Sequence, residues 1–316
     1  MHRATLLAAA CSLVALAQTS VPAGTPAEVV VTVGHYFGPE TPALTQDNLT
    51  IAQQYEPLPI TNLIPLRGDR AGLELFLLVD NCSSCEPGTK FEELRRFIVA
   101  QPSTTSIGVA YIRNRSLEVA ENPTQDRDRA VEALNVPEGN KPASPYDALT
   151  ALINRWGETS SRRAVLMISN GIDPTATERA EDPAVETAIA AAQLARVTVY
   201  AMYHPSADYL SSDMSKIYNG QVQLAHLAVE TGGEAYFVSF GPLPTLAPFL
   251  ADLSDHLANQ YMLQFLANPV EEPGTLERVT VKSKVHDVEL MVPDKTWIPG
   301  GGVTDKQLKG TPGKGQ

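Results

Sequence analysis

The chain has 316 residues, of which 43% are hydrophobic and 19% are charged, and its formal net charge is −12. This length is sufficient for one large domain or two smaller ones with a sizeable core. The acidic balance argues against a nucleic-acid partner, because phosphate binding needs clustered Lys and Arg.

The first residues have the pattern of a secretory signal peptide. A short cationic start precedes an apolar run over residues 4–16, and Ala15-Leu16-Ala17 is a small-x-small cleavage signal. We therefore expect a signal peptide at residues 1–17, cleaved after Ala17, and a secreted or periplasmic protein. The alternative is a lipid anchor at Cys11, which follows three alanines. No other apolar stretch approaches the ~20 residues of a membrane span, so no transmembrane segment is expected.

Residues 18–70 predict a small β-rich unit. Residues 29–33 are rich in β-branched side chains, residues 49–51 form a short second run, and residues 58–66 form an extended run interrupted by two prolines. We expect three or four strands here.

From Gly72 onward, strand-like and helix-like segments alternate. The expected strands are residues 73–80, 106–112, 116–120, 164–169, 197–203 and 234–239. The expected helices are residues 90–100, 127–134, 145–156, 184–195, 221–231 and 245–259. Alternating units with continuous apolar strands predict an α/β fold over residues 71–260: a doubly wound, mostly parallel sheet with helices on both faces.

Extended segments return after this region, at residues 261–267, 275–284 and 285–292. We expect residues 261–298 to form antiparallel hairpins that pack with the N-terminal unit. Residues 299–316 are rich in glycine and lysine without apolar periodicity, which predicts a disordered tail.

Polar side chains follow the expected parallel strands. In an open parallel sheet, ligands bind beyond the carboxyl ends of the strands. Asp80 ends the first strand of the α/β region, and Asn170 and Asp173 follow a later one. Such oxygen-bearing side chains bind hard cations. The alternatives are a loop or helix cap for Asp80 and a turn or helix cap for Asp173.

The order of these segments resembles a von Willebrand factor type A domain. The metal-ion-dependent adhesion site of that family is D-x-S-x-S, a Thr in a later loop, and an Asp that ends the next strand. Residues 80–84 stand in the place of the first element, residues 145–149 look like the helix that follows the metal threonine, and residues 163–173 are similar to the later strand and loop. The flanking segments resemble exported proteins of this broad group from Acidobacteria. The resemblance covers nearly the whole chain after residue 17 and implies the type A fold.

Transferred residue by residue, the resemblance gives a degenerate metal site. The corresponding positions fall on Asp80, Cys82, Ser84, Ser144 (or Ala143, in the other register) and Asn170. Cys82 stands where the family has serine, and sulfur is a poor ligand for Mg²⁺. Asn170 stands where the family has aspartate and lacks its charge. We expect no cofactor; the alternative is Mg²⁺ or Mn²⁺ at a variant site.

Cys82 and Cys85 form a C-x-x-C pair. Export and removal of residues 1–17 would leave this even pair in an oxidising compartment, so a disulfide that clamps the loop is expected. The alternative is a redox-active pair, which would make the chain a secreted thiol–disulfide protein. Glu86 tends to raise the pKa of the neighbouring thiol rather than activate it.

These observations predict an exported protein-interaction or adhesion module without enzyme activity. The Gly-x-Ser-x-Gly motif of hydrolases and the Gly-rich phosphate loops are absent from the sequence. The predicted binding face contains Asn81, Ser83, Asp173 and His204, and binds a protein partner of unknown identity. For His204, the alternative is an exposed histidine without a partner.

Overall fold

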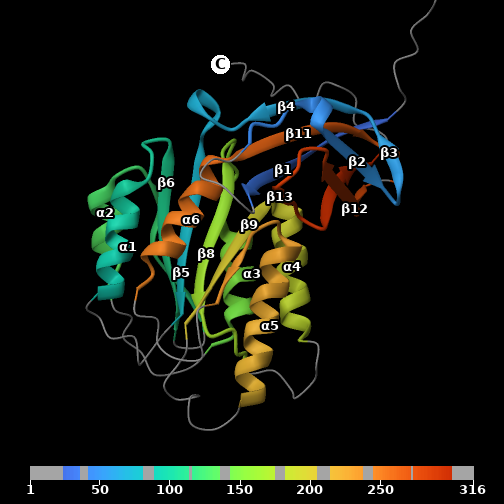
Figure 1. The fold of residues 1–316 in the computed structure, drawn as a ribbon. Coiled ribbons are helices and arrows are strands. Elements are labelled where there is room, and N and C mark those ends of the chain that lie inside the picture. Colours follow the sequence, from blue (N-terminus) through green and yellow to red (C-terminus); the bar gives the residue numbers. More distant parts are fainter. Residues whose placement is uncertain are drawn as a thin grey trace, which may run out of the picture.

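A computed structural model describes residues 24–35, 42–80, 89–113, 116–135, 143–174, 182–204, 214–237, 245–271 and 273–300. The strands in these ranges form one six-stranded sheet and two four-stranded sheets (Figure 1). The predicted fold class is confirmed: a mostly parallel sheet with helices on both faces, plus antiparallel sheets built from the N- and C-terminal strands.

The six-stranded sheet has the order β10-β9-β8-β5-β6-β7. Its strands are β5 (Leu73–Asp80), β6 (Thr105–Arg113), β7 (Ser116–Thr124), β8 (Arg162–Ser169), β9 (Val197–Tyr203) and β10 (Ala235–Tyr236). All neighbouring pairs are parallel except β6 and β7, which are antiparallel. The central strands are continuous apolar runs because both faces of this sheet are covered.

Alternate residues of β5 enter two different cores. Leu75 and Leu77 pack under one helical layer, while Phe76 and Leu78 pack under the other, because successive side chains of a strand point to opposite faces. The first layer contains α1 (Thr89–Ala100), α2 (Arg127–Ala133) and α6 (Ala247–Ala258). The second layer contains α3 (Pro145–Arg155), α4 (Pro183–Ala195) and α5 (Met214–Glu230).

The antiparallel sheets have the orders β13-β1-β11-β4 and β14-β12-β2-β3. The first contains β1 (Thr25–His35), β4 (Ile60–Pro65), β11 (Gln260–Ala267) and β13 (Val288–Met291). The second contains β2 (Leu49–Gln53), β3 (Glu56–Leu58), β12 (Gly274–Ser283) and β14 (Lys295–Pro299). Short 3₁₀ helices lie at Gln46–Asn48 and Gly68–Arg70. Residues of both sheets share one hydrophobic cluster, so the N- and C-terminal strands form a common unit.

Two elements differ most from the prediction. Helix α5 begins at Met214, whereas the sequence predicted a start at Gln221. Its first turns place exposed Met214 and Tyr218 beside buried Ile217, and this arrangement obscures the amphipathic pattern in the sequence. Strand β14 was not predicted, and it extends into the region assigned to the disordered tail. It pairs with β12 and buries Thr296 and Ile298. Residues 301–316 lie outside the described residues.

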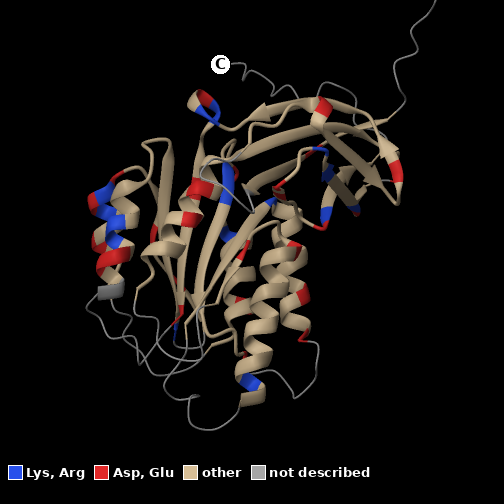
Figure 2. Ribbon diagram, viewed as in Figure 1, with Lys and Arg blue, Asp and Glu red and all other residues tan. Residues whose placement is uncertain are grey.

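The two ends of the six-stranded sheet have different surroundings. The antiparallel sheets lie at the end drawn uppermost in Figure 1, and the carboxyl ends of β5 and β8 lie at the opposite end. Charged residues of both signs crowd onto α1 and α2, whereas α3, α4 and α5 carry few (Figure 2). None of the helices in the described ranges is long and apolar enough to cross a membrane.

Candidate functional site

The carboxyl ends of β5 and β8 form the topological switch point of the six-stranded sheet. From β5 the chain passes through α1 to β6 on one side, and from β8 it passes through α4 to β9 on the other. Ligands of open α/β sheets bind in the crevice at this point. Here the Ser169 hydroxyl donates a hydrogen bond to Asp80 Oδ2 over 2.7 Å. The last polar groups of the two strands therefore lie side by side.

The start of α3 is bound to the loop that follows β8. Ser144 caps the helix by accepting from the Asp147 backbone N–H over 3.2 Å, and its hydroxyl donates to Asp173 Oδ2. Ser144 and Asp173 are both buried. The Tyr146 hydroxyl donates to the Gly171 carbonyl over 2.8 Å. These bonds bring a second hydroxyl and a second carboxylate to the switch point.

The loop after β8 lies directly against α5. Gly171 has a φ of +69°, and a Cβ at this position would stand 2.3 Å from the Gly220 carbonyl oxygen. A Cβ on Gly220 would in turn stand 2.5 Å from the Asn170 carbonyl oxygen. The Asn170 side chain turns back on its own loop and accepts from the Ile172 N–H over 2.9 Å. Glycine at both contact points thus fixes the loop by close backbone packing.

The electrostatic potential at this site is negative. Burial raises the pKa of the Tyr146 hydroxyl well above its usual value, and the charges of Asp182, Asp173 and Asp80 raise it further. Burial also raises the pKa of Asp182, with an added contribution from Asp173. One oxygen of Asp182 caps the first turn of α4, while Oδ2 is buried without a hydrogen-bond partner within the described part of the chain. Such a concentration of carboxylates favours a positively charged group in its surroundings.

The structure places the predicted site residues in three groups. Asp80, Ser144, Asn170 and Asp173 lie together at the switch point. Asn81, Cys82, Ser83, Ser84 and Cys85 lie outside the described residues. His204 is only 6% exposed, so the interpretation of an exposed histidine is wrong. Its backbone N–H donates to the Ser169 carbonyl over 2.9 Å, because the pairing of β9 with β8 continues one residue beyond the strand.

The sequence predictions include Ser169 and Tyr146 only as parts of the segments 163–173 and 145–149, and they give no role to Asp182. Asp182 carries a readable signal, because an aspartate directly before Pro183 is typical of a helix N-cap followed by proline at the first helical position. In the sequence, Ser169 has only the pattern of a strand end, and Tyr146 has only the pattern of the start of an amphipathic helix. Their polar contacts are between segments far apart in the sequence.

The described residues do not reproduce the cation ligands of the type A family. Oxygen donors such as Asp80, Asp173 and the two serine hydroxyls suit a hard cation. However, the Asn170 amide oxygen is engaged by its own loop, and the Ser144 hydroxyl is directed to Asp173. The sequence adds a cysteine where the family has a serine. At Cys82 and Asn170 the residue type therefore differs from that of the family's ligands.

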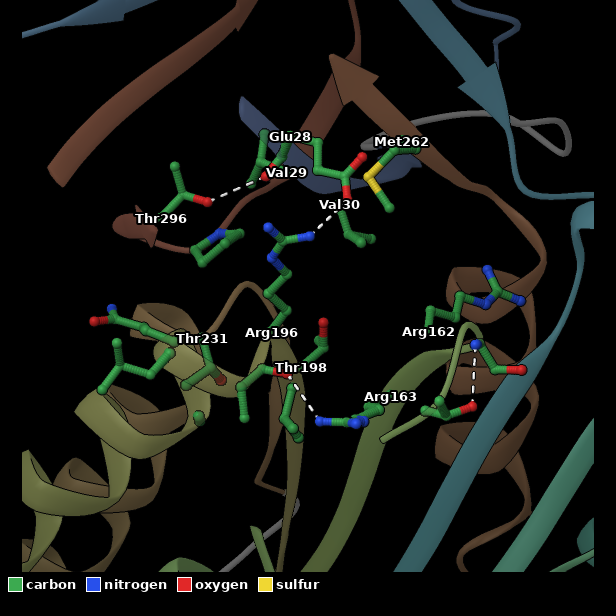
Figure 3. A pocket seen from close by; sticks show the side chains of 18 of the residues that line it. Glu28, Val29, Val30, Arg162, Arg163, Arg196, Thr198, Thr231, Met262 and Thr296 are labelled. Atoms are coloured by element: carbon green, nitrogen blue, oxygen red, sulfur yellow. Dashed lines mark hydrogen bonds and ion pairs between the residues drawn. The ribbon is translucent and has the colours of Figure 1, made fainter. Parts of the chain in front are cut away.

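A separate pocket of about 430 Å³ lies near the amino ends of β8 and β9, beside β1 (Figure 3). Arg196 projects across it and pairs with Glu28 over 2.5 Å, and Thr296 donates to the Glu28 carbonyl over 3.3 Å (Figure 3). Arg163 donates to the Gly157 carbonyl over 2.7 Å. Since these arginines are engaged by the chain itself, we interpret the pocket as a junction between the parallel and antiparallel sheets.

No protein-family model matches the chain, and no curated protein matches it. Its structure is similar to several solved structures. BatB from Bacteroides thetaiotaomicron is 16% identical, with a TM-score of 0.43 over 59% of this chain and 98% of that one. The vWF domain of the pilus tip protein Mfa5 from Porphyromonas gingivalis is 9% identical, with a TM-score of 0.43 over 58% of this chain and 94% of that one. VWA2 from Sulfolobus acidocaldarius is 10% identical, with a TM-score of 0.39 over 85% and 76%. Likeness at this level says nothing about what the chain binds.

Proposed function

We propose that the chain is an exported, non-catalytic protein-interaction module with a degenerate metal-ion-dependent adhesion site. Its binding face is the carboxyl end of the six-stranded sheet. One observation carries the proposal: Asp80, Ser169, Ser144 and Asp173 gather at the switch point, where open α/β sheets bind their ligands. The resemblance of residues 80–84 and 163–173 to the type A family supports the same face.

An exposed apolar stripe on α5 supports a protein partner. Met214, Tyr218 and Val222 are 62%, 63% and 47% exposed, and their spacing of four residues places them on one side of the helix. The stripe begins at the end of α5 that lies with the carboxyl ends of the strands (Figure 1). Apolar side chains beside an acidic crevice suit a partner that offers an apolar surface and a basic residue.

The arrangement of the serines supports a binding role rather than catalysis. A nucleophilic serine needs a base within hydrogen-bond reach that is itself oriented by a third group. The hydroxyls of Ser169 and Ser144 each donate to a carboxylate rather than to an imidazole. Export rests on the signal-peptide pattern of residues 1–17.

Partner capture with surface variants tests the proposal. We expect Tyr218→Ala and Asp80→Ala to weaken retention of a partner from the native envelope and medium fractions by at least tenfold, since interface anchors cost about 1.4 kcal/mol or more when truncated. Val99→Ala is the matched control, because Val99 is 62% exposed on α1, in the other helical layer. Equal retention by the parent, Tyr218→Ala and Asp80→Ala would contradict the proposed face.

Cation titration tests the degenerate site. We expect no saturable heat when Mg²⁺ or Mn²⁺ is added to the chain at millimolar concentration, because the described oxygen donors are engaged with each other or with their own loop. Calorimetry on the parent and on Asp80→Ala measures this. Saturable heat in the parent that disappears in Asp80→Ala would instead establish a cation-dependent binder with a variant metal site.

A further inference from the structure

A second cluster of ligand-type side chains lies at the edge strand β10. Glu234 directly precedes β10, while Asp252 and His256 lie four residues apart on α6 and therefore face the same direction. One ligand atom from each of the three lies within 4.8 Å of the others. The cluster is separated from β8 by β9, and its residues take no part in the switch point.

The two distances from His256 match those between neighbouring ligands of a tetrahedrally coordinated cation. His256 Nδ1 lies 3.4 Å from Glu234 Oε2 and 3.5 Å from Asp252 Oδ2. Around a tetrahedral Zn²⁺ with bonds of about 2.0–2.1 Å, neighbouring ligand atoms are about 3.3–3.4 Å apart. One imidazole nitrogen with two carboxylates is also a donor set that suits zinc.

The surroundings orient these ligands. The Tyr236 hydroxyl donates to Asp252 Oδ2 over 3.0 Å. Carboxylates that bind a metal are commonly oriented by such a hydrogen bond from a residue outside the ligand set. His256 is 8% exposed, and its ring stacks against Tyr200 with the centroids 6.4 Å apart. The side chains of Glu234 and Asp252 are 44% and 49% exposed, which leaves an entry for an ion from solvent.

The two carboxylates of the cluster repel each other in the absence of a cation, because one oxygen of each lies within 4.8 Å of the other. A divalent cation would remove the repulsion between the two carboxylates.

We propose that Glu234, Asp252 and His256 form a zinc site with its fourth position open to solvent. The site joins α6 to the edge of the six-stranded sheet, close to β1: a Cβ on Gly34 would stand 3.5 Å from His256 Nε2. It is independent of the proposed binding face and its degenerate adhesion site. A zinc ion there would tie the position of α6 to that of β10.

Calorimetric titration of the full chain with ZnCl₂ tests the site, and cysteines are alkylated beforehand so that they cannot bind the ion. We expect one equivalent of zinc to bind and the melting temperature to rise. Glu234→Gln and Asp252→Asn should each weaken zinc binding by about tenfold or more. Both substitutions change partly exposed side chains, so the fold should tolerate them. Co²⁺ in place of zinc should give the intense visible absorption of tetrahedral coordination.

Two controls distinguish zinc binding at this site from attraction to the negative charge nearby and from zinc binding at the switch point. Glu289→Gln removes a neighbouring charge without removing a ligand, and Asp80→Ala alters the other site; both should retain the parent's zinc affinity within about threefold. The proposal is overturned by the absence of saturable zinc binding, by unchanged affinity in Glu234→Gln and Asp252→Asn, or by loss of binding in Asp80→Ala.

Discussion

Replacing Gly171 with alanine should destabilise the chain by about 3 kcal/mol. Two costs combine at this position. A φ of +69° is unfavourable for an L-residue by about 1–2 kcal/mol. The added Cβ would also stand 2.3 Å from the Gly220 carbonyl oxygen and 2.7 Å from Leu224 Cγ, so α5 or the loop has to move, and such overpacking costs about 1–3 kcal/mol. Urea denaturation followed by circular dichroism measures the loss.

Alanine substitutions at two other glycines separate the conformational cost from the cost of overpacking. Gly68 has a φ of +59° with no atom within 4 Å of a built Cβ, so Gly68→Ala should show the conformational cost alone, about 1 kcal/mol. Gly157 has open space and no positive φ, so Gly157→Ala should be neutral within about 0.5 kcal/mol. If Gly171→Ala lost no more stability than Gly68→Ala, close packing of the loop on α5 would not hold the switch point in place.

The fold was predictable because its signals are local. The apolar run of β5 ends on Asp80, and an acid after a buried strand predicts a polar group at the carboxyl edge of a parallel sheet. Ser144 before Pro145 is also a local pattern typical of a helix N-cap, and Ser144 caps α3 in the structure. The local pattern of the sequence thus placed Asp80 at this end of the sheet, whereas Ser144 was assigned there through the resemblance to the type A family.

The contacts within the site were not predictable in this way. The bond from Ser169 to Asp80 joins residues in two different strands, and it depends on the strand order, which places β8 beside β5. The burial of His204 depends on the continuation of β9 pairing along β8. The cluster of Glu234 with His256 depends on how α6 lies against β10. Local propensity contains none of these relations.

The junction between the parallel and antiparallel sheets depends on a buried polar network around Gln260. This residue begins β11 and is 2% exposed. Its side-chain NH₂ donates to Thr32 Oγ1 over 2.9 Å and to the Tyr200 hydroxyl over 3.3 Å, and its carbonyl oxygen accepts from Arg162 over 2.7 Å. One amide thus links β1, β8, β9 and β11.

Arg162 makes this network sensitive to substitution. Burial lowers the pKa of its guanidinium to about 10, so the group is still charged at neutral pH. Its Nε is buried without a hydrogen-bond partner among the described residues. Its side-chain acceptors are neutral: the Gln260 amide oxygen and, over 3.5 Å, the Ala71 carbonyl. Loss of the shorter bond would leave a buried charge with little compensation.

Gln260→Leu should therefore destabilise the chain by about 3–4 kcal/mol, because it removes the main acceptor of a buried charge and the shared partner of two buried hydroxyls. Gln260→Glu should cost less than about 1 kcal/mol, since a carboxylate accepts from Arg162 and from both hydroxyls. The two side chains are similar in size, so the difference between their urea midpoints reports the network rather than the volume. Equal stability of the two variants would mean that Arg162 reaches water and that apolar packing alone holds the sheets together.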